Sequence, residues 1–130
     1  CQDMVLEVSQ NASSLNRIVL WKKNGSPYQK FKLRESNGRY FITNAAAGLM
    51  IEVPNKSQAK GVNIFAGSQG NDIEKMWDFV ESKNKDGSFY IKSFCGKCLD
   101  VCEQKTSNAT PIIQYNYNGD KNQIWHIKPV

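Results

Sequence analysis

Short segments in which hydrophobic and polar residues alternate run along the whole chain, separated by clusters of glycine, asparagine, serine and aspartate. In one segment Leu6 and Val8 flank Glu7, and in another Leu99 and Val101 flank Asp100. Successive side chains of a strand point to opposite faces of a sheet, so this alternation is typical of half-buried β-strands. No stretch has a convincing helical period. The pattern therefore predicts an all-β barrel or sandwich.

One strand pattern occurs three times, as Met4-Val5-Leu6-Glu7-Val8, Leu49-Met50-Ile51-Glu52-Val53 and Lys97-Cys98-Leu99-Asp100-Val101. Its closing valines are 45 and 48 residues apart, and the bulky aromatics that follow, Phe31, Trp77 and Trp125, are 46 and 48 residues apart. Two markers that advance together indicate true internal repeats. We therefore expect three units, approximately 1–44, 45–93 and 94–130, that share one core in a single domain over 1–130.

Each unit is expected to contain further short strands. The second strand is predicted at 18–21, 62–65 and 112–115, the aromatic strand at 29–33, 76–80 and 124–127, and a fourth strand at 38–42 and 87–91. The fourth strands follow Asn37-Gly38 and Asp86-Gly87, dipeptides that favour hairpins. Closing twelve such strands into one unit would remove exposed strand edges. The third unit ends without a fourth strand, so we expect that strand to come from elsewhere, with residues before Cys1 as one source.

The charge of the chain gives little sign of an anionic polymer as partner. The 130 residues include 17 lysines and arginines and 12 aspartates and glutamates, a net charge of +5. These cations are scattered, and Lys22-Lys23 is the only adjacent pair. A solvated basic surface is favoured over a nucleic-acid or heparin patch, and we expect no nucleic-acid partner. No run of eighteen apolar residues exists, so no membrane span is expected.

Four cysteines stand at Cys1, Cys95, Cys98 and Cys102. The Cys95-Gly96-Lys97-Cys98 spacing resembles redox and zinc motifs, but a zinc site would need a second such pair or two histidines, and His126 is the only histidine. We therefore expect no metal and no cofactor. Cys98 and Cys102 lie too far apart along a strand to bond each other, and a disulfide to Cys1 or to a partner chain stays open.

The sequence contains four glycosylation sequons, whereas about 1.4 would be expected by chance from its composition. Their asparagines are Asn11, Asn24, Asn55 and Asn108, of which Asn24 is a poor acceptor because Pro27 directly follows its sequon. The excess favours a secreted or cell-surface glycoprotein. The start at Cys1 rather than methionine indicates a processed product or a module of a larger protein.

The third unit carries three motifs in order: Cys98-Leu99-Asp100-Val101, then Ile113-Gln114-Tyr115, then Asn122-Gln123-Ile124-Trp125. Repeated in this order, such motifs resemble those of the ricin-B type β-trefoil lectin family, with its C-L-D-V strand, Q-x-W strand and N-Q pair before the last tryptophan. The resemblance covers essentially the whole chain and is strongest in the third unit. It implies a β-trefoil of three four-stranded repeats and a non-enzymatic module that binds galactose or N-acetylgalactosamine.

The resemblance also implies roles for four residues of the third unit. Asp100 would accept hydrogen bonds from two sugar hydroxyls, and Tyr115 would stack on the apolar face of the sugar ring. Asn122 would complete the polar clamp, and Gln123 would orient Asp100. The chemistry suits a sugar independently, because amides both donate and accept hydrogen bonds and an aromatic ring covers a C–H face.

Two residues depart from the family pattern. Ile113 stands where the family often has glutamine, which removes one polar neighbour from the site. Tyr117 stands where the family has a cysteine partner for Cys98, so the family's disulfide within the unit cannot form.

The other units match less well. The first aligns Glu7, Trp21, Tyr28 and Gln29 with the four site residues and is a second candidate carbohydrate site. The second offers Glu52 and Phe65 but has Glu74-Lys75 in place of asparagine and glutamine, so it is interpreted as degenerate and structural.

Other interpretations of these residues remain open. The aromatics Phe31, Trp77 and Trp125 repeat with inward aliphatics and are expected in the core, while His126 alternates outward and is expected to be exposed. One histidine leaves no plausible catalytic triad. The main alternative is a trefoil that binds proteins or heparin and whose sugar sites are vestigial. A second is an accessory domain whose enzymatic partner is missing from this chain. The chain could also be part of a larger protein or oligomer.

Overall fold

A computed structural model describes residues 4–129, which form twelve short strands and no α-helix. The strands of the first unit are β1 (Met4–Val8), β2 (Ile18–Lys22), β3 (Phe31–Ser36) and β4 (Arg39–Asn44). Those of the second are β5 (Met50–Glu52), β6 (Val62–Asn63), β7 (Phe65–Gly67), β8 (Asp78–Glu81) and β9 (Ser88–Lys92). The third has β10 (Cys98–Val101), β11 (Thr110–Tyr115) and β12 (Trp125–His126). The sequence predicted that the third unit lacks a fourth strand, and none occurs within residues 94–129.

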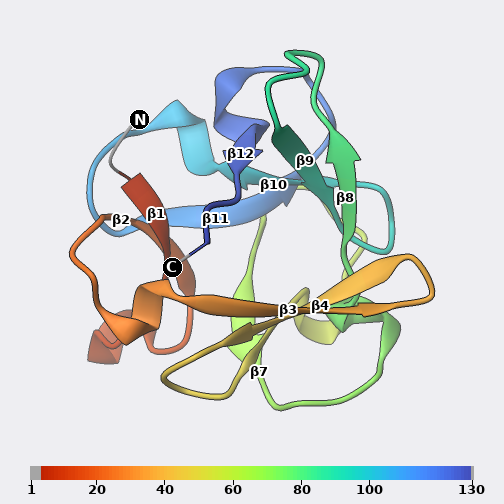
Figure 1. Ribbon diagram of the computed structural model, residues 1–130. Helices are drawn as coiled ribbons and strands as arrows, with labels where there is room; N and C mark the ends of the chain where they lie inside the picture. Colours follow the sequence, from red (N-terminus) through yellow and green to blue (C-terminus); the bar gives the residue numbers. More distant parts are fainter. Residues whose placement is uncertain (1–3, 130) are drawn as a thin grey trace.

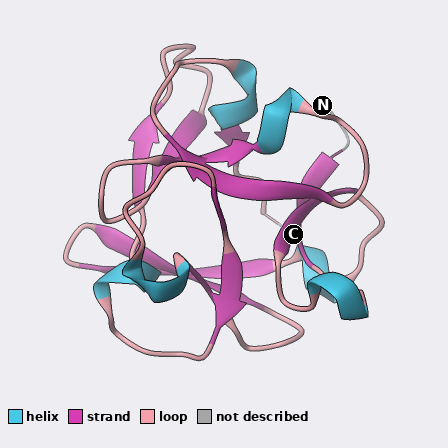
Figure 2. Ribbon diagram, turned by 180° about the vertical axis from the view of Figure 1, so that it is seen from behind, coloured by secondary structure: helices cyan, strands magenta, loops and turns pink. Residues whose placement is uncertain are grey.

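Six 3-10 turns join the strands: η1 (Ala12–Ser14), η2 (Pro27–Gln29), η3 (Pro54–Lys56), η4 (Ile73–Lys75), η5 (Cys102–Gln104) and η6 (Lys121–Gln123). Figure 2 shows these turns at the periphery and the strands around a common centre. None of the helical segments within residues 4–129 is long and apolar enough to cross a membrane.

The strands form two sheets. The larger follows the order β1-β2-β11-β10-β9-β12, with β6 paired to β11 and β8 to β9. The smaller follows the order β3-β4-β5-β7. Figure 1 shows the β3–β4 hairpin (orange) below β10 (teal) and β12 (dark blue). The two sheets therefore present separate surfaces.

Three equivalent isoleucines meet at the centre. The Ile18 N–H donates to the Ile64 carbonyl (2.8 Å), and the Ile64 N–H donates to the Ile112 carbonyl (2.9 Å). All three are fully buried, in a core that also contains Val8, Val53, Val101, Ile51 and Leu99. These contacts show which residues correspond among the three units, because Ile18 and Ile112 also pair with the equivalent valines Val8 and Val101.

The repeated aromatics lie against this core, as predicted. Trp77 has no exposed surface, and Trp125 and Phe31 are partly buried against the core. The Trp77 and Trp125 indole N–H groups donate to the carbonyls of Ile51 (2.9 Å) and Leu99 (3.1 Å), so each ring also holds the first strand of its unit.

The two predicted hairpin dipeptides behave differently. Asn37 and Gly38 have φ values of 52° and 83°, and they join β3 to β4 as a tight two-residue turn. Asp86-Gly87 directly precedes β9, but the connection from β8 is a longer loop over 82–87. In that loop the Asp86 side chain accepts from the Ser88 backbone N–H (3.2 Å) and sets the start of β9.

Candidate functional site

Asp100 is the centre of a polar cluster on the third unit. It lies on β10 opposite Ile113 of β11, while its neighbours Leu99 and Val101 belong to the hydrophobic core. The predicted orientation away from the core is therefore confirmed. Asp100 is nevertheless only 3% exposed, because the η6 turn folds over it. The alternation of side chains along the strand predicted the direction in which the Asp100 side chain points, but it did not predict that the side chain is buried.

Two side chains of η6 hold the Asp100 carboxylate. The Gln123 Nε2 donates to Oδ2 (2.8 Å), and the Asn122 Nδ2 donates to Oδ1 (2.9 Å). Gln123 is fully buried and is fixed at both ends, since its amide also donates to the Asn116 carbonyl (2.8 Å) and accepts from the Asn118 N–H (3.0 Å). Gln123 thus has the geometry of a residue that orients Asp100.

The electrostatics of Asp100 follow from its burial. Desolvation raises the pKa of Asp100 above its ordinary value, and the hydrogen bonds from Gln123 and Asn122 oppose that rise. An ionised carboxylate has about four lone-pair sites. Each oxygen has accepted one amide hydrogen here and retains capacity for another donor. By lone-pair count, the Asp100 carboxylate can therefore accept from two hydroxyl groups without losing its amide supports.

A shallow depression of about 550 Å³ opens over this cluster. Asp100, Ile113, Tyr115 and Asn122 line it, together with Gly61, Cys102, Glu103, Gln104 and Asn118. The Asn122 Oδ1 is buried and has no hydrogen-bond partner among the described residues. Burying an acceptor without a donor costs about 1–3 kcal/mol, so a ligand hydroxyl placed there would relieve that cost.

A loop of the second unit completes the rim beside Tyr115. The Gln114 Nε2 donates to the carbonyls of Ser57 and Ala59 (2.9 Å each), which anchors the loop that leads to Gly61. The Lys60 ammonium lies 5.6 Å from the centroid of the Tyr115 ring. Sequence reasoning missed Lys60 and Gly61, since no motif signals a contact between units.

The first unit repeats part of this arrangement. The Gln29 Nε2 donates to Glu7 (2.9 Å) and to the Lys22 carbonyl (3.0 Å), and Gln29 accepts from the Asn24 N–H (3.0 Å). These bonds match those of Gln123 one for one. Tyr28, however, has no amide equivalent to that of Asn122, and its ring packs against the core. Trp21 lies partly exposed at the end of β2, at the position of Tyr115.

The second unit corrects one sequence alignment. Glu52 pairs with Phe65 as Asp100 pairs with Ile113, so Phe65 matches Ile113 and Gly67 takes the place of Tyr115. The unit therefore has no aromatic ring at the stacking position. The Lys75 ammonium forms a close ion pair with Glu52, and a side chain on Gly67 would collide with the Glu52 carboxyl group. This pairing fits the interpretation of the second unit as structural.

The three cysteines within residues 4–129 form no cluster suited to a metal. Cys95, Cys98 and Cys102 are free thiols, and burial raises the pKa of Cys98. No group of three or more metal-binding side chains occurs within residues 4–129, and Cys1 lies outside the described part of the chain. Tyr117, at the family's second cysteine position, packs edge-on against Tyr90 instead, with ring centroids 5.0 Å apart.

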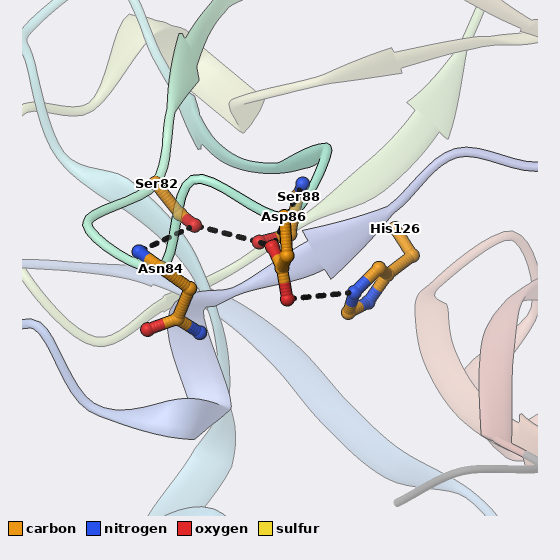
Figure 3. Close-up of polar contacts among 5 residues, drawn as sticks. All are labelled: Ser82, Asn84, Asp86, Ser88 and His126. Atoms are coloured by element: carbon orange, nitrogen blue, oxygen red, sulfur yellow. Dashed lines mark hydrogen bonds and ion pairs between the residues drawn. The ribbon is translucent and has the colours of Figure 1, made fainter.

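His126 is exposed, as predicted, and lies 3.6 Å from Asp86. Figure 3 shows Asp86 between His126 and a pair of serines, with Ser88 donating to Asp86 and Ser82 2.6 Å from Ser88. His126 forms no hydrogen bond to either serine among the described contacts. The cluster therefore lacks the nucleophile–base contact of a catalytic triad, and it ties the β8–β9 loop to β12.

Comparison with known proteins places this geometry in a family. The family model for ricin-type β-trefoil lectin domain-like proteins matches residues 2–67, 27–115 and 74–130. No curated protein sequence matches the chain. Among solved structures, the designed threefold-symmetric protein ThreeFoil is 26% identical with a TM-score of 0.89, over 98% of this chain and 96% of its own.

Two natural proteins are also similar. The exo-β-1,3-galactanase 1,3Gal43A of Clostridium thermocellum is 27% identical with a TM-score of 0.83, over 95% of this chain but only 29% of its own. The ricin B-like lectin of Macrolepiota procera, solved in complex with lactose, is 15% identical with a TM-score of 0.80, over 95% of this chain and 91% of its own. The expected β-trefoil is confirmed. The chain belongs to the ricin-type β-trefoil lectin domain-like family, and its fold is that of a carbohydrate-binding lectin module.

Proposed function

We propose that the third unit binds a terminal galactose or N-acetylgalactosamine residue of a glycan in the depression over Asp100. The observation that carries this proposal is a buried carboxylate with spare acceptor capacity beside the unpartnered Asn122 Oδ1. Both acceptors line one depression with an aromatic ring. The lactose complex of the Macrolepiota procera lectin supports a galactose-type ligand for this fold.

Recognition would combine a polar clamp with stacking. Two neighbouring hydroxyls donate to Asp100, and such hydrogen bonds to a charged acceptor are about twice as strong as neutral ones. A further hydroxyl donates to the Asn122 Oδ1. The axial hydroxyl of a galactose ring leaves its C–H groups contiguous on one face, which suits contact with the Tyr115 ring.

Replacing Tyr115 tests the stacking half of this mechanism. We expect Tyr115→Ala to weaken lactose binding about tenfold, because an aromatic contact of about 1–1.5 kcal/mol is lost. Tyr115→Phe keeps the ring and is expected to bind within about threefold of the wild type. Isothermal titration calorimetry with lactose measures both. Equal affinities for the alanine and phenylalanine variants would rule out stacking on this ring.

The affinity is expected to fall on acidification. Ionised Asp100 can accept hydroxyl hydrogens on both oxygens, whereas protonated Asp100 carries a hydrogen on one of them. The sugar therefore binds the ionised form more tightly, and affinity is lost as the pH drops through the pKa that Asp100 has in the ligand-free protein. Because burial raises that pKa, the loss should begin at a higher pH than for an exposed aspartate. Titrations between pH 7 and 4, on protein shown to be folded, measure it. Glu7→Gln should leave the curve unchanged, and a flat curve in the wild type would contradict a role for Asp100.

The alternative, a protein- or heparin-binding trefoil with vestigial sugar sites, predicts different behaviour. Its binding would depend steeply on salt and would resist competition by a neutral sugar. Free galactose should instead displace a glycan from the third unit at constant salt. Such displacement separates the two functions without any substitution.

We also propose a secreted or cell-surface location for this non-enzymatic module. The four sequon asparagines are all exposed, which leaves Asn11, Asn55 and Asn108 open to glycosylation, while Pro27 disfavours Asn24. Single shallow sugar sites bind weakly, so further sites, oligomers or neighbouring domains would supply avidity. The galactanase, in which a similar domain is one part of a longer chain, is one such arrangement.

A further inference from the structure

A second depression, of about 340 Å³, lies on the small sheet, away from the proposed sugar site. We refer to it as the small-sheet depression. Its lining includes Lys32 and Arg34 of β3, Thr43 of β4 and Met50 of β5, with Gly48 and Gln69 from the loops. Its volume falls within the range of about 300–1,000 Å³ typical of small-molecule sites. Nothing in the sugar-binding motifs accounts for it.

The hollow has a physical origin in the repeats. One row of paired residues crosses the small sheet, namely Lys32, Thr43, Met50 and Gly67. The equivalent row of the large sheet is Asp78, Lys92, Cys98 and Tyr115. A glycine thus replaces the aromatic ring that ends the other row.

A second aromatic is also missing. Two residues beyond Gly67 stands Gln69, at the position that Tyr117 has in the third unit, where the Tyr117 ring packs on Tyr90 and lies 5.4 Å from the Lys92 ammonium. Gln69 is smaller and is tied down by a hydrogen bond from its Nε2 to the Gly48 carbonyl (3.0 Å). The small-sheet depression is therefore open where the third unit is filled.

The small-sheet depression is positively charged. Lys32 and Arg34 are two residues apart on β3, so both side chains emerge from the same face of the sheet. Neither forms an ion pair with another described residue, and no carboxylate is among the residues that line the depression. The Arg34 guanidinium lies over the buried Phe41 ring, 4.5 Å from its centroid, and stacking of this kind engages the flat face of a guanidinium rather than its N–H edge.

We infer that the small-sheet depression binds an acidic sugar, through a sulfate or carboxylate group held by Lys32 and Arg34. A guanidinium presents paired N–H donors that match two oxygens of either anion. The Thr43 hydroxyl and the Gln69 amide lie where they can meet sugar hydroxyls, and Met50 supplies an apolar floor. This site is independent of the one proposed around Asp100, and either can fail without the other.

Four ligands, three of them built on a glucose ring, test the inference without involving the galactose site. Glucose 6-sulfate and glucuronic acid carry the two anions on a glucose ring, and glucose and inorganic sulfate are their controls. Backbone amide shifts in NMR titrations should move around residues 32–34, 43–50 and 67–69, and at least one acidic sugar should bind more tightly than both controls. The tighter acid identifies the anion. Equal binding of inorganic sulfate, or tighter binding of a short oligonucleotide in the same place, would overturn the assignment to an acidic sugar.

Two test variants and one control variant examine the residues of the small-sheet depression. Lys32→Gln with Arg34→Gln should weaken the acidic sugar about tenfold, whereas Lys83→Gln with Lys85→Gln removes the same charge elsewhere and should change the affinity by less than about twofold. Gln69→Tyr fills the hollow without any change of charge and should also weaken binding about tenfold. Amide spectra establish that each variant is folded. The inference would be contradicted if the two double variants lost equal affinity for the acidic sugar, or if Gln69→Tyr bound it as tightly as the wild type.

Discussion

Asp100→Ala is expected to lower the affinity for galactose-type glycans by about hundredfold or more. The substitution removes two hydrogen bonds to a charged acceptor, each worth about 1.5–3 kcal/mol, and 1.4 kcal/mol corresponds to tenfold in affinity. It also releases the Asn122 and Gln123 amides that Asp100 now holds. A glycan array and calorimetry with lactose, with folding followed by circular dichroism, measure the loss.

Glu7→Ala is the matched control for this experiment. Glu7 occupies the same position on β1 and accepts from Gln29 as Asp100 accepts from Gln123. If the third unit is the main site, Glu7→Ala leaves most of the affinity in place. A folded Asp100→Ala protein that still binds, while Glu7→Ala does not, would assign the sugar to the first unit.

Trp77→Ala is expected to destabilise the fold by about 3–5 kcal/mol, the range found when a buried large aromatic is truncated. Trp77 is fully buried, and its indole N–H holds the Ile51 carbonyl at 2.9 Å, so both packing and a hydrogen bond are lost. A domain of this size is stable by about 5–15 kcal/mol, so the variant would stand near the threshold of folding.

Urea denaturation followed by fluorescence and circular dichroism measures the free energy of unfolding. Trp21→Ala is the matched control, because Trp21 lies partly exposed at the rim of β2 rather than in the core. We expect it to cost about 1 kcal/mol or less. Similar losses in the two variants would show that Trp77 does not have the structural role that its position among the repeats implies.

The fold was predictable because the sequence contains three copies of the same strand pattern. The three copies of the first strand, and the spacing of Phe31, Trp77 and Trp125, carry the information needed to place a shared core. The structure differs from the predicted alignment of the second unit at Phe65. Phe65 was aligned with Tyr115 because both are aromatic, whereas the backbone contacts of Ile64 with Ile18 and Ile112 set the register two residues away.

The site was predictable in its residues but not in its environment. Strand alternation gives the direction of Asp100, while its burial depends on η6, more than twenty residues further along the chain. The position of Lys60 beside Tyr115 depends on a loop of a different unit. The small-sheet depression arises from the absence of two aromatic rings, and such an absence has no signature in a single sequence.

Chemical-shift mapping of the wild type with methyl β-galactoside tests the central proposal most directly, because it reports where a neutral sugar binds. We predict the largest amide shifts at residues 100–104 and 115–123, and their disappearance in folded Asp100→Ala. The absence of shifts with every neutral galactoside, or shifts centred on Glu7 and Trp21, would contradict a galactose site in the third unit.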